Sequence, residues 1–215
     1  MTKRISLLLI IGFLLLDSGA AAAGTARLQS YVIRGGDSFF TTTGRCTVGV
    51  AVRGGYVTAG ACGRVGEAVR GRNQTAQGAI RASSFPSASM AWVEVNPDWV
   101  PRGAVNGVGG EIAVRGGSPA PVGSSVCRSG GTSGWHCGIL LRRNASVTYP
   151  QGTLHGLIEA SVCAEPGDLG APLMSAGHVQ GVLVGSTGNC STGGRSYYQP
   201  IDEILQRYGL TLLTL

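Results

Sequence analysis

Six cysteines and three histidines are the residues of this sequence best able to do chemistry, as metal ligands, nucleophiles or disulfide partners. No C-x-x-C or H-x-x-x-H spacing joins them, so neither a metal site nor any other cofactor is expected. Three disulfides are expected instead. The spacing favours the local pairs Cys46–Cys62, Cys127–Cys137 and Cys163–Cys190, because each pair brackets a glycine-rich turn between strand-like runs.

Residues 1–23 have the pattern of a secretory signal peptide. Lys3 and Arg4 supply the positive start, residues 5–16 the apolar core, and three alanines at 21–23 a cleavage site of small residues. An amphipathic or core helix is the alternative, but the run has no polar face and is too short to cross a bilayer comfortably. We therefore expect a secreted protein that begins near Gly24 and matures in an oxidising compartment.

The composition favours a folded protein built from strands. Of 215 residues, 36 are glycine, 43% are hydrophobic and 13% are charged, which suits a sizeable core with many turns better than a helical bundle. The net charge of +6 could attract polyanions. The arginines are scattered, however, and no aromatic residues interleave with them, so neither nucleic acid nor membrane is expected as a partner. A monomer with an unknown protein or peptide ligand is expected.

Short alternating segments recur at turn spacing, which is typical of a barrel or sandwich. The clearest are residues 47–52, 55–59, 89–95, 123–128, 157–162 and 179–184. One convincing helix follows at 200–209, with a proline and acidic residues early and Gly209 at its end. A glycine- and proline-rich stretch between about 106 and 121 could separate two halves of comparable size.

Two motifs carry a family resemblance. Residues 57–63 (VTAGACG) and 167–172 (GDLGAP) closely resemble T-A-G-H-C and G-D-S-G-G-P, the signature segments of chymotrypsin-like serine proteases of the α-lytic protease and streptogrisin branch. Supporting strings extend the resemblance over roughly residues 31–213. It implies an all-β fold of two six-stranded antiparallel β-barrels (trypsin-like) with a C-terminal helix. The first barrel would comprise residues 24–112, and the second barrel, with the helix, residues 113–215. The resemblance also implies the disulfide pairing given above.

The family's catalytic triad needs a hydroxyl nucleophile, an imidazole and a carboxylate. At the three equivalent positions this sequence has Leu169, Ala61 and Ser89. We therefore predict a secreted, inactive serine protease homologue, a pseudoprotease acting as a binding or decoy module and not an enzyme. The alternative is a trypsin-like serine endopeptidase with residual or rerouted hydrolase activity. A decaying gene product without a selected role is a third possibility.

The resemblance also implies parts of the site that do not depend on the triad. The backbone N–H groups of Gly167 and Leu169 correspond to the oxyanion hole. The cleft would include Ala164, Val184 and Ser186, and we expect Leu169 and Val184 to fill it. Arg128 and Asp168 correspond to a buried structural ion pair, with two unrelated surface charges as the alternative.

The three histidines stand at 136, 155 and 178. The family register places none of them beside Leu169. They are expected to be surface or structural residues.

Overall fold

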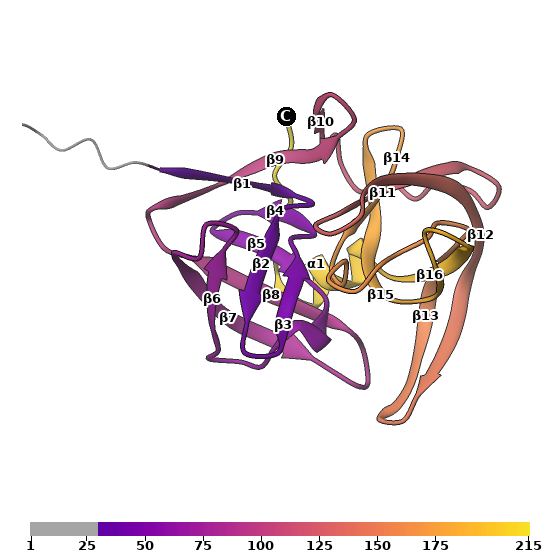
Figure 1. Cartoon of the computed structure of the whole chain (residues 1–215), viewed down its shortest axis with the longest axis horizontal. Helices are drawn as coiled ribbons and strands as arrows, with labels where there is room; N and C mark the ends of the chain where they lie inside the picture. Colours follow the sequence, from indigo (N-terminus) through magenta and orange to yellow (C-terminus); the bar gives the residue numbers. More distant parts are fainter. Residues whose placement is uncertain (1–29) are drawn as a thin grey trace, which may run out of the picture.

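The computed structural model describes residues 30–215, and the predicted signal peptide at 1–23 lies outside them. Strands hold more than half of the described residues, and the other regular elements are one short 3-10 helix and one α-helix near the C-terminal end (Figure 1). Within this part of the chain, no helix is long and apolar enough to span a membrane.

The C-terminal half is a closed six-stranded barrel, as expected. Its strand order is β11-β12-β13-β16-β15-β14, with antiparallel pairing throughout (Figure 1). The strands are β11 (Ser125–Gly130), β12 (Gly134–Tyr149), β13 (Gly152–Ala160), β14 (Pro172–Ser175), β15 (His178–Asn189) and β16 (Gly193–Pro200). Apolar side chains from all six strands, among them Val126, Leu140, Ile158 and Leu183, fill its interior.

The N-terminal half differs from the expected six-stranded barrel. Its seven strands form a sheet in the order β3-β2-β6-β7-β8-β5-β4. They are β2 (Ser38–Thr41), β3 (Gly44–Thr47), β4 (Val50–Val52), β5 (Gly55–Thr58), β6 (Ala68–Gly71), β7 (Ala76–Ser84) and β8 (Met90–Val95). The segment predicted as one strand at 47–52 is divided at Val48 and Gly49, so its two parts, β3 and β4, become the opposite edges of the sheet.

A third sheet was not predicted. In it β1 (Tyr31–Gly35) pairs in parallel with β9 (Trp99–Gly107), and β9 pairs with β10 (Gly110–Ala113). The stretch that was predicted to separate the halves therefore begins as a hairpin and not as an open linker. The proposed boundary between residues 112 and 113 falls at the end of β10.

The two halves share a core. The α-helix α1 (Ile201–Tyr208) buries Ile201 and Ile204 against apolar side chains from both halves. Gly209 ends the helix in the left-handed conformation, with φ of 62°. The residues beyond it return to the N-terminal sheet, where Leu212 bridges Val52 and the Leu213 N–H donates to the Ala51 carbonyl at 3.0 Å.

Three disulfides have the pairing that the sequence predicted: Cys46–Cys62, Cys127–Cys137 and Cys163–Cys190. The first joins β3 to the 3-10 helix at Gly60–Cys62, and the second links the paired strands β11 and β12. Disulfides of this kind persist in oxidising compartments, so the protein belongs to such a compartment.

Candidate active site

The site is built on the turn at residues 165–170, which leads from β13 into β14. Two glycines in it have positive φ, +95° at Gly167 and +90° at Gly170. A Cβ at Gly167 would lie 2.4 Å from Thr132 Oγ1, and one at Gly170 would lie 2.0 Å from Thr58 Oγ1. Because both the backbone conformation and the space exclude a side chain, these positions require glycine.

Thr47 of β3 fixes the orientation of this turn. Its N–H donates to the Leu169 carbonyl and its hydroxyl to the Gly167 carbonyl, both at 2.8 Å. The N–H groups of Gly167 and Leu169 donate to no group among residues 30–215. Two free N–H groups in one turn are suited to bind an anion or the oxyanion of a reacting carbonyl.

Asp168 anchors the same turn from inside and is fully buried. Its carboxylate accepts hydrogen bonds from the Ser133 hydroxyl at 2.6 Å and from the N–H groups of Thr132 and Glu165, both at 2.9 Å. Burial alone would raise the pKa of this carboxyl. The Ser133 hydrogen bond, the Arg128 charge and the backbone N–H groups outweigh burial and hold the pKa below its usual value.

Arg128 is the ionic partner of Asp168 and is also fully buried. Its Nη1 lies 3.1 Å from Asp168 Oδ2 without hydrogen-bond geometry, so the attraction at that atom is electrostatic. Its Nε and Nη2 donate to the Cys163 carbonyl at 3.0 Å and to Ser133 Oγ at 2.7 Å. The pair therefore joins β11 to the turn at residues 165–170.

A hollow of about 600 Å³ opens beside the turn. Ala164, Gly167, Leu169 and Ser186 are among the residues that line it. Val184 does not line it, because its side chain is buried in a separate apolar cluster inside the β12–β13 hairpin. Of the two residues expected to fill the cleft, Leu169 lines this hollow and also packs against the apolar core of the N-terminal half, whereas Val184 lies outside the hollow.

The other two positions predicted to correspond to the triad lie in the N-terminal half, outside its strands. Ala61 sits half-buried in the 3-10 helix and lines a second hollow of about 590 Å³. Ser89 is fully buried just before β8; its N–H donates to Gln199 Oε1 at 3.1 Å, and its hydroxyl has no partner among the described residues. The turn lies close to Ala61, because the Leu169 carbonyl is 3.8 Å from the sulfur of the adjacent Cys62.

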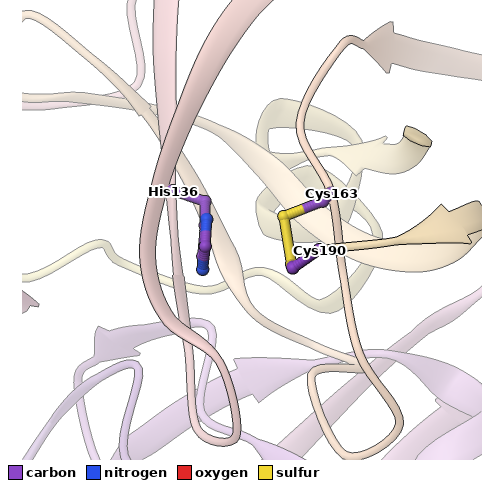
Figure 2. A group of neighbouring side chains, drawn as sticks. All are labelled: His136, Cys163 and Cys190. Atoms are coloured by element: carbon purple, nitrogen blue, oxygen red, sulfur yellow. A yellow bond between two sulfur atoms is a disulfide. The ribbon is translucent and has the colours of Figure 1, made fainter. Parts of the chain in front are cut away.

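None of the three histidines lines the hollow beside Leu169. His155 Nδ1 lies 2.9 Å from the Ser146 hydroxyl on the exposed β12–β13 hairpin, and His178 Nδ1 accepts weakly from the Ser118 N–H at 3.4 Å. Figure 2 shows His136 beside the Cys163–Cys190 disulfide. Both sulfurs there are bonded to each other, so they supply no thiolate to a metal.

Thr47, Ser133 and Arg45 are site residues that the sequence reasoning missed. The first two position the turn through the hydrogen bonds above. Arg45 Nε would lie 2.8 Å from a Cβ at Gly167. Arg45 and Thr47 flank Cys46, but no sequence signal connects this segment to a turn so far along the chain.

Comparisons with known proteins agree with this fold. The family model described as Trypsin matches residues 33–207. Streptogrisin-C of Streptomyces griseus is 52% identical over 85% of this chain, which spans 41% of that relative's length. Crystal structures of a Cellulomonas bogoriensis chymotrypsin and of Nocardiopsis protease each cover 86% of this chain, and all of their own, at 45% and 43% identity and TM-scores of 0.81.

These comparisons contradict the prediction of a protein that is not an enzyme and serves only as a binding or decoy module. The relatives at 52% and 45% identity are named as a streptogrisin and a chymotrypsin. The residues at positions 61, 89 and 169 do not by themselves exclude hydrolysis, because an oxyanion site and substrate binding provide part of the catalysis without a triad. The chain is a member of the trypsin family of chymotrypsin-fold serine proteases, with homologues of the streptogrisin and α-lytic type.

Proposed function

We propose that this protein is a trypsin-fold endopeptidase with residual hydrolase activity, carried by its backbone oxyanion site and not by a side-chain nucleophile. The observation that carries the proposal is the pair of free N–H groups at Gly167 and Leu169 beside an open hollow. Serine proteases that lack triad members retain hydrolysis of about 10³- to 10⁴-fold over the reaction in water, from oxyanion stabilisation and binding.

The reaction would be a direct addition of water to the peptide bond. The substrate carbonyl oxygen accepts hydrogen bonds from the two N–H groups, and a water molecule adds to the carbonyl carbon. The C–N bond then breaks, the carboxyl product keeps the water oxygen, and the amine product takes a proton. No acyl-enzyme forms, because Leu169 offers no nucleophilic atom.

The hollow sets the kind of peptide that fits. Its lining includes the apolar residues Ala164, Pro166 and Leu183, so an apolar side chain next to the scissile bond would be favoured. We also propose that residues 1–23 direct the protein to secretion, which agrees with its three disulfides. Its substrates would then be extracellular peptides or unfolded segments of proteins.

The test is incubation of the purified, oxidised protein with a mixture of ten-residue peptides in water enriched in oxygen-18. Mass spectrometry would count new carboxyl termini that carry the heavy oxygen. We expect cleavage after apolar residues, above a blank without protein. The same cleavage should persist after treatment with a fluorophosphonate, which reacts with activated serines.

Two results would overturn the proposal. One is a product yield no higher than the blank. The other is cleavage that the fluorophosphonate abolishes, because that activity would come from a serine nucleophile, either a contaminating protease or another site on this chain.

A further inference from the structure

An arginine beside the oxyanion turn has no assigned role. Arg45 lies at an exposed position of β3, and its guanidinium makes no ion pair or side-chain hydrogen bond among residues 30–215. A Cβ at Gly167 would lie 2.8 Å from its Nε and 3.4 Å from its Nη2. The unpaired positive charge of Arg45 therefore lies next to Gly167, one of the two residues whose N–H groups have no acceptor among the described residues.

The backbone geometry keeps the arginine and the turn together. Arg45 is two residues from Thr47, whose hydroxyl donates to the Gly167 carbonyl and whose N–H donates to the Leu169 carbonyl, both at 2.8 Å. The Cys46–Cys62 disulfide secures the same strand. Both the cation and the N–H groups are thus placed by covalent and hydrogen-bonded structure.

The acidic residues of the turn do not neutralise Arg45. Asp168 faces inward and is paired with Arg128 at 3.1 Å. Glu165 also lines the hollow, and its Oε1 accepts from the Cys190 N–H at 2.8 Å. The negative charge of Glu165 opposes an anion in the part of the hollow near Cys190, so an anion would be favoured at the Arg45 and Gly167 end.

We propose that Arg45, with the N–H groups of Gly167 and Leu169, binds the C-terminal carboxylate of a peptide. One carboxylate oxygen would accept from the N–H pair and the other from the guanidinium, which are both strong donors to an ionised oxygen. A C-terminal residue suits the site better than a free anion, because its own side chain can enter the adjacent hollow of about 600 Å³. The inference goes beyond hydrolysis and does not need turnover.

The experiment compares two forms of one acetylated hexapeptide that ends in leucine, with a free acid or an amide at its C-terminus. Binding to the full protein is measured by calorimetry, and mass spectrometry verifies that the peptides stay intact. We expect the acid to bind about tenfold more tightly than the amide, as a charge-assisted contact provides. Arg45→Gln should remove this difference.

Arg53→Gln is the matched control, because Arg53 is also an exposed arginine without an ion pair among the described residues and lies in the β4–β5 turn. Arg53→Gln lowers the net charge by the same amount as Arg45→Gln, and it should leave the preference for the peptide acid over the amide intact. Thermal unfolding of both variants verifies that each is folded.

Equal binding of acid and amide would overturn the inference. So would an equal loss in the two variants, which would indicate a general charge effect, or acetate binding as tightly as the peptide acid, which would indicate a site for free anions. Failure here leaves the oxygen-18 measurement unaffected, because that experiment scores cleavage of internal bonds. Each proposal can therefore fail without the other.

Discussion

The two sides of the active-site region differ in where their chemistry resides. On the C-terminal side, the turn at 165–170 presents backbone N–H groups without acceptors among the described residues, and glycines and the buried Asp168 hold the turn in place. On the N-terminal side, the family's chemistry needs side chains at positions 61 and 89, and this chain has alanine and serine there. This chain therefore has the backbone N–H groups of the family's site but not the side chains of its catalytic triad.

This contrast shows that the backbone N–H groups of the turn and the triad side chains can be present independently of each other. A backbone site is a product of the fold, since the hydrogen bonds of Thr47 and Asp168 that hold the turn also connect it to β3 and to the turn between β11 and β12. The triad acts through side chains, so its residues can be exchanged while these backbone hydrogen bonds remain. Ser89 is fully buried and its hydroxyl has no partner among the described residues, so this position has a polar group that forms no hydrogen bond there.

The largest effect is expected from restoring the side chains. The triple variant Ala61→His, Ser89→Asp, Leu169→Ser should raise kcat for peptide cleavage by about 10³-fold or more, because triad members act as a unit. Single-turnover and steady-state assays with the same peptides would measure it. Leu169→Ser alone should gain little, and the triple variant should acquire a pH dependence near the histidine pKa that the natural protein lacks.

An unchanged rate in the triple variant would contradict the residue correspondence at these positions. Reaction of the triple variant with a fluorophosphonate provides a second readout. Leu169→Ser alone should react slowly, because no imidazole activates its hydroxyl.

The next largest effect concerns the buried ion pair. Asp168→Ala leaves the Arg128 charge buried without its partner, so the free energy of unfolding should fall by about 3–5 kcal/mol. Denaturant unfolding measures it. Glu94→Ala is the matched control, because it removes a carboxylate from the exposed Arg81–Glu94 pair and should cost at most about 1 kcal/mol. Equal losses in the two variants would contradict the anchoring role of Asp168.

A smaller effect is expected at Gly167. Gly167→Ala introduces a Cβ that would contact Thr132 Oγ1 and Arg45 at a positive φ, so the residual hydrolysis should fall by about 10²-fold as the N–H pair is displaced. Gly44→Ala is the control, because Gly44 also has positive φ but open space around it. A rate that falls equally in both would point to general strain and not to the oxyanion site.

The smallest effect is the acid dependence of stability. The pKa of Asp168 is lower in the folded protein than its usual value, so ionisation stabilises the fold above about pH 4. That contribution should be lost as the pH falls through the lower, folded-state pKa. Unfolding measured between pH 5 and pH 2 should show a weaker pH dependence in Asp168→Asn than in the natural protein. Parallel curves would contradict this assignment.

Local patterns predicted part of the fold. The six alternating segments overlap seven of the sixteen strands, among them β5, β8 and β15. Proline, acidic residues and Gly209 placed the helix within a residue of its observed bounds at Ile201–Tyr208. The disulfide pairs were also correct. These features depend on residues near each other in the sequence, where spacing carries information.

Features that depend on distant segments were missed. The 47–52 segment is divided at Val48 and Gly49, where the Val48 N–H donates to the Asp37 carbonyl at 2.8 Å and the Gly49 N–H to the Val57 carbonyl at 2.9 Å, contacts that form only in the folded protein. The parallel pairing of β1 with β9 and the position of Arg45 against Gly167 arise in the same way. The family resemblance located the turn and the buried Arg128–Asp168 pair, but not Thr47, Ser133 or Arg45 beside it.

The return of the C-terminal segment to the N-terminal sheet affects how the protein is made. Residues 211–213 form hydrogen bonds with Ala51 and Arg53, and Leu212 bridges Val52. During synthesis these partners leave the ribosome well before residues 211–213 do. The N-terminal half therefore cannot complete this hydrogen bonding until residues 211–213 have been made and have left the ribosome.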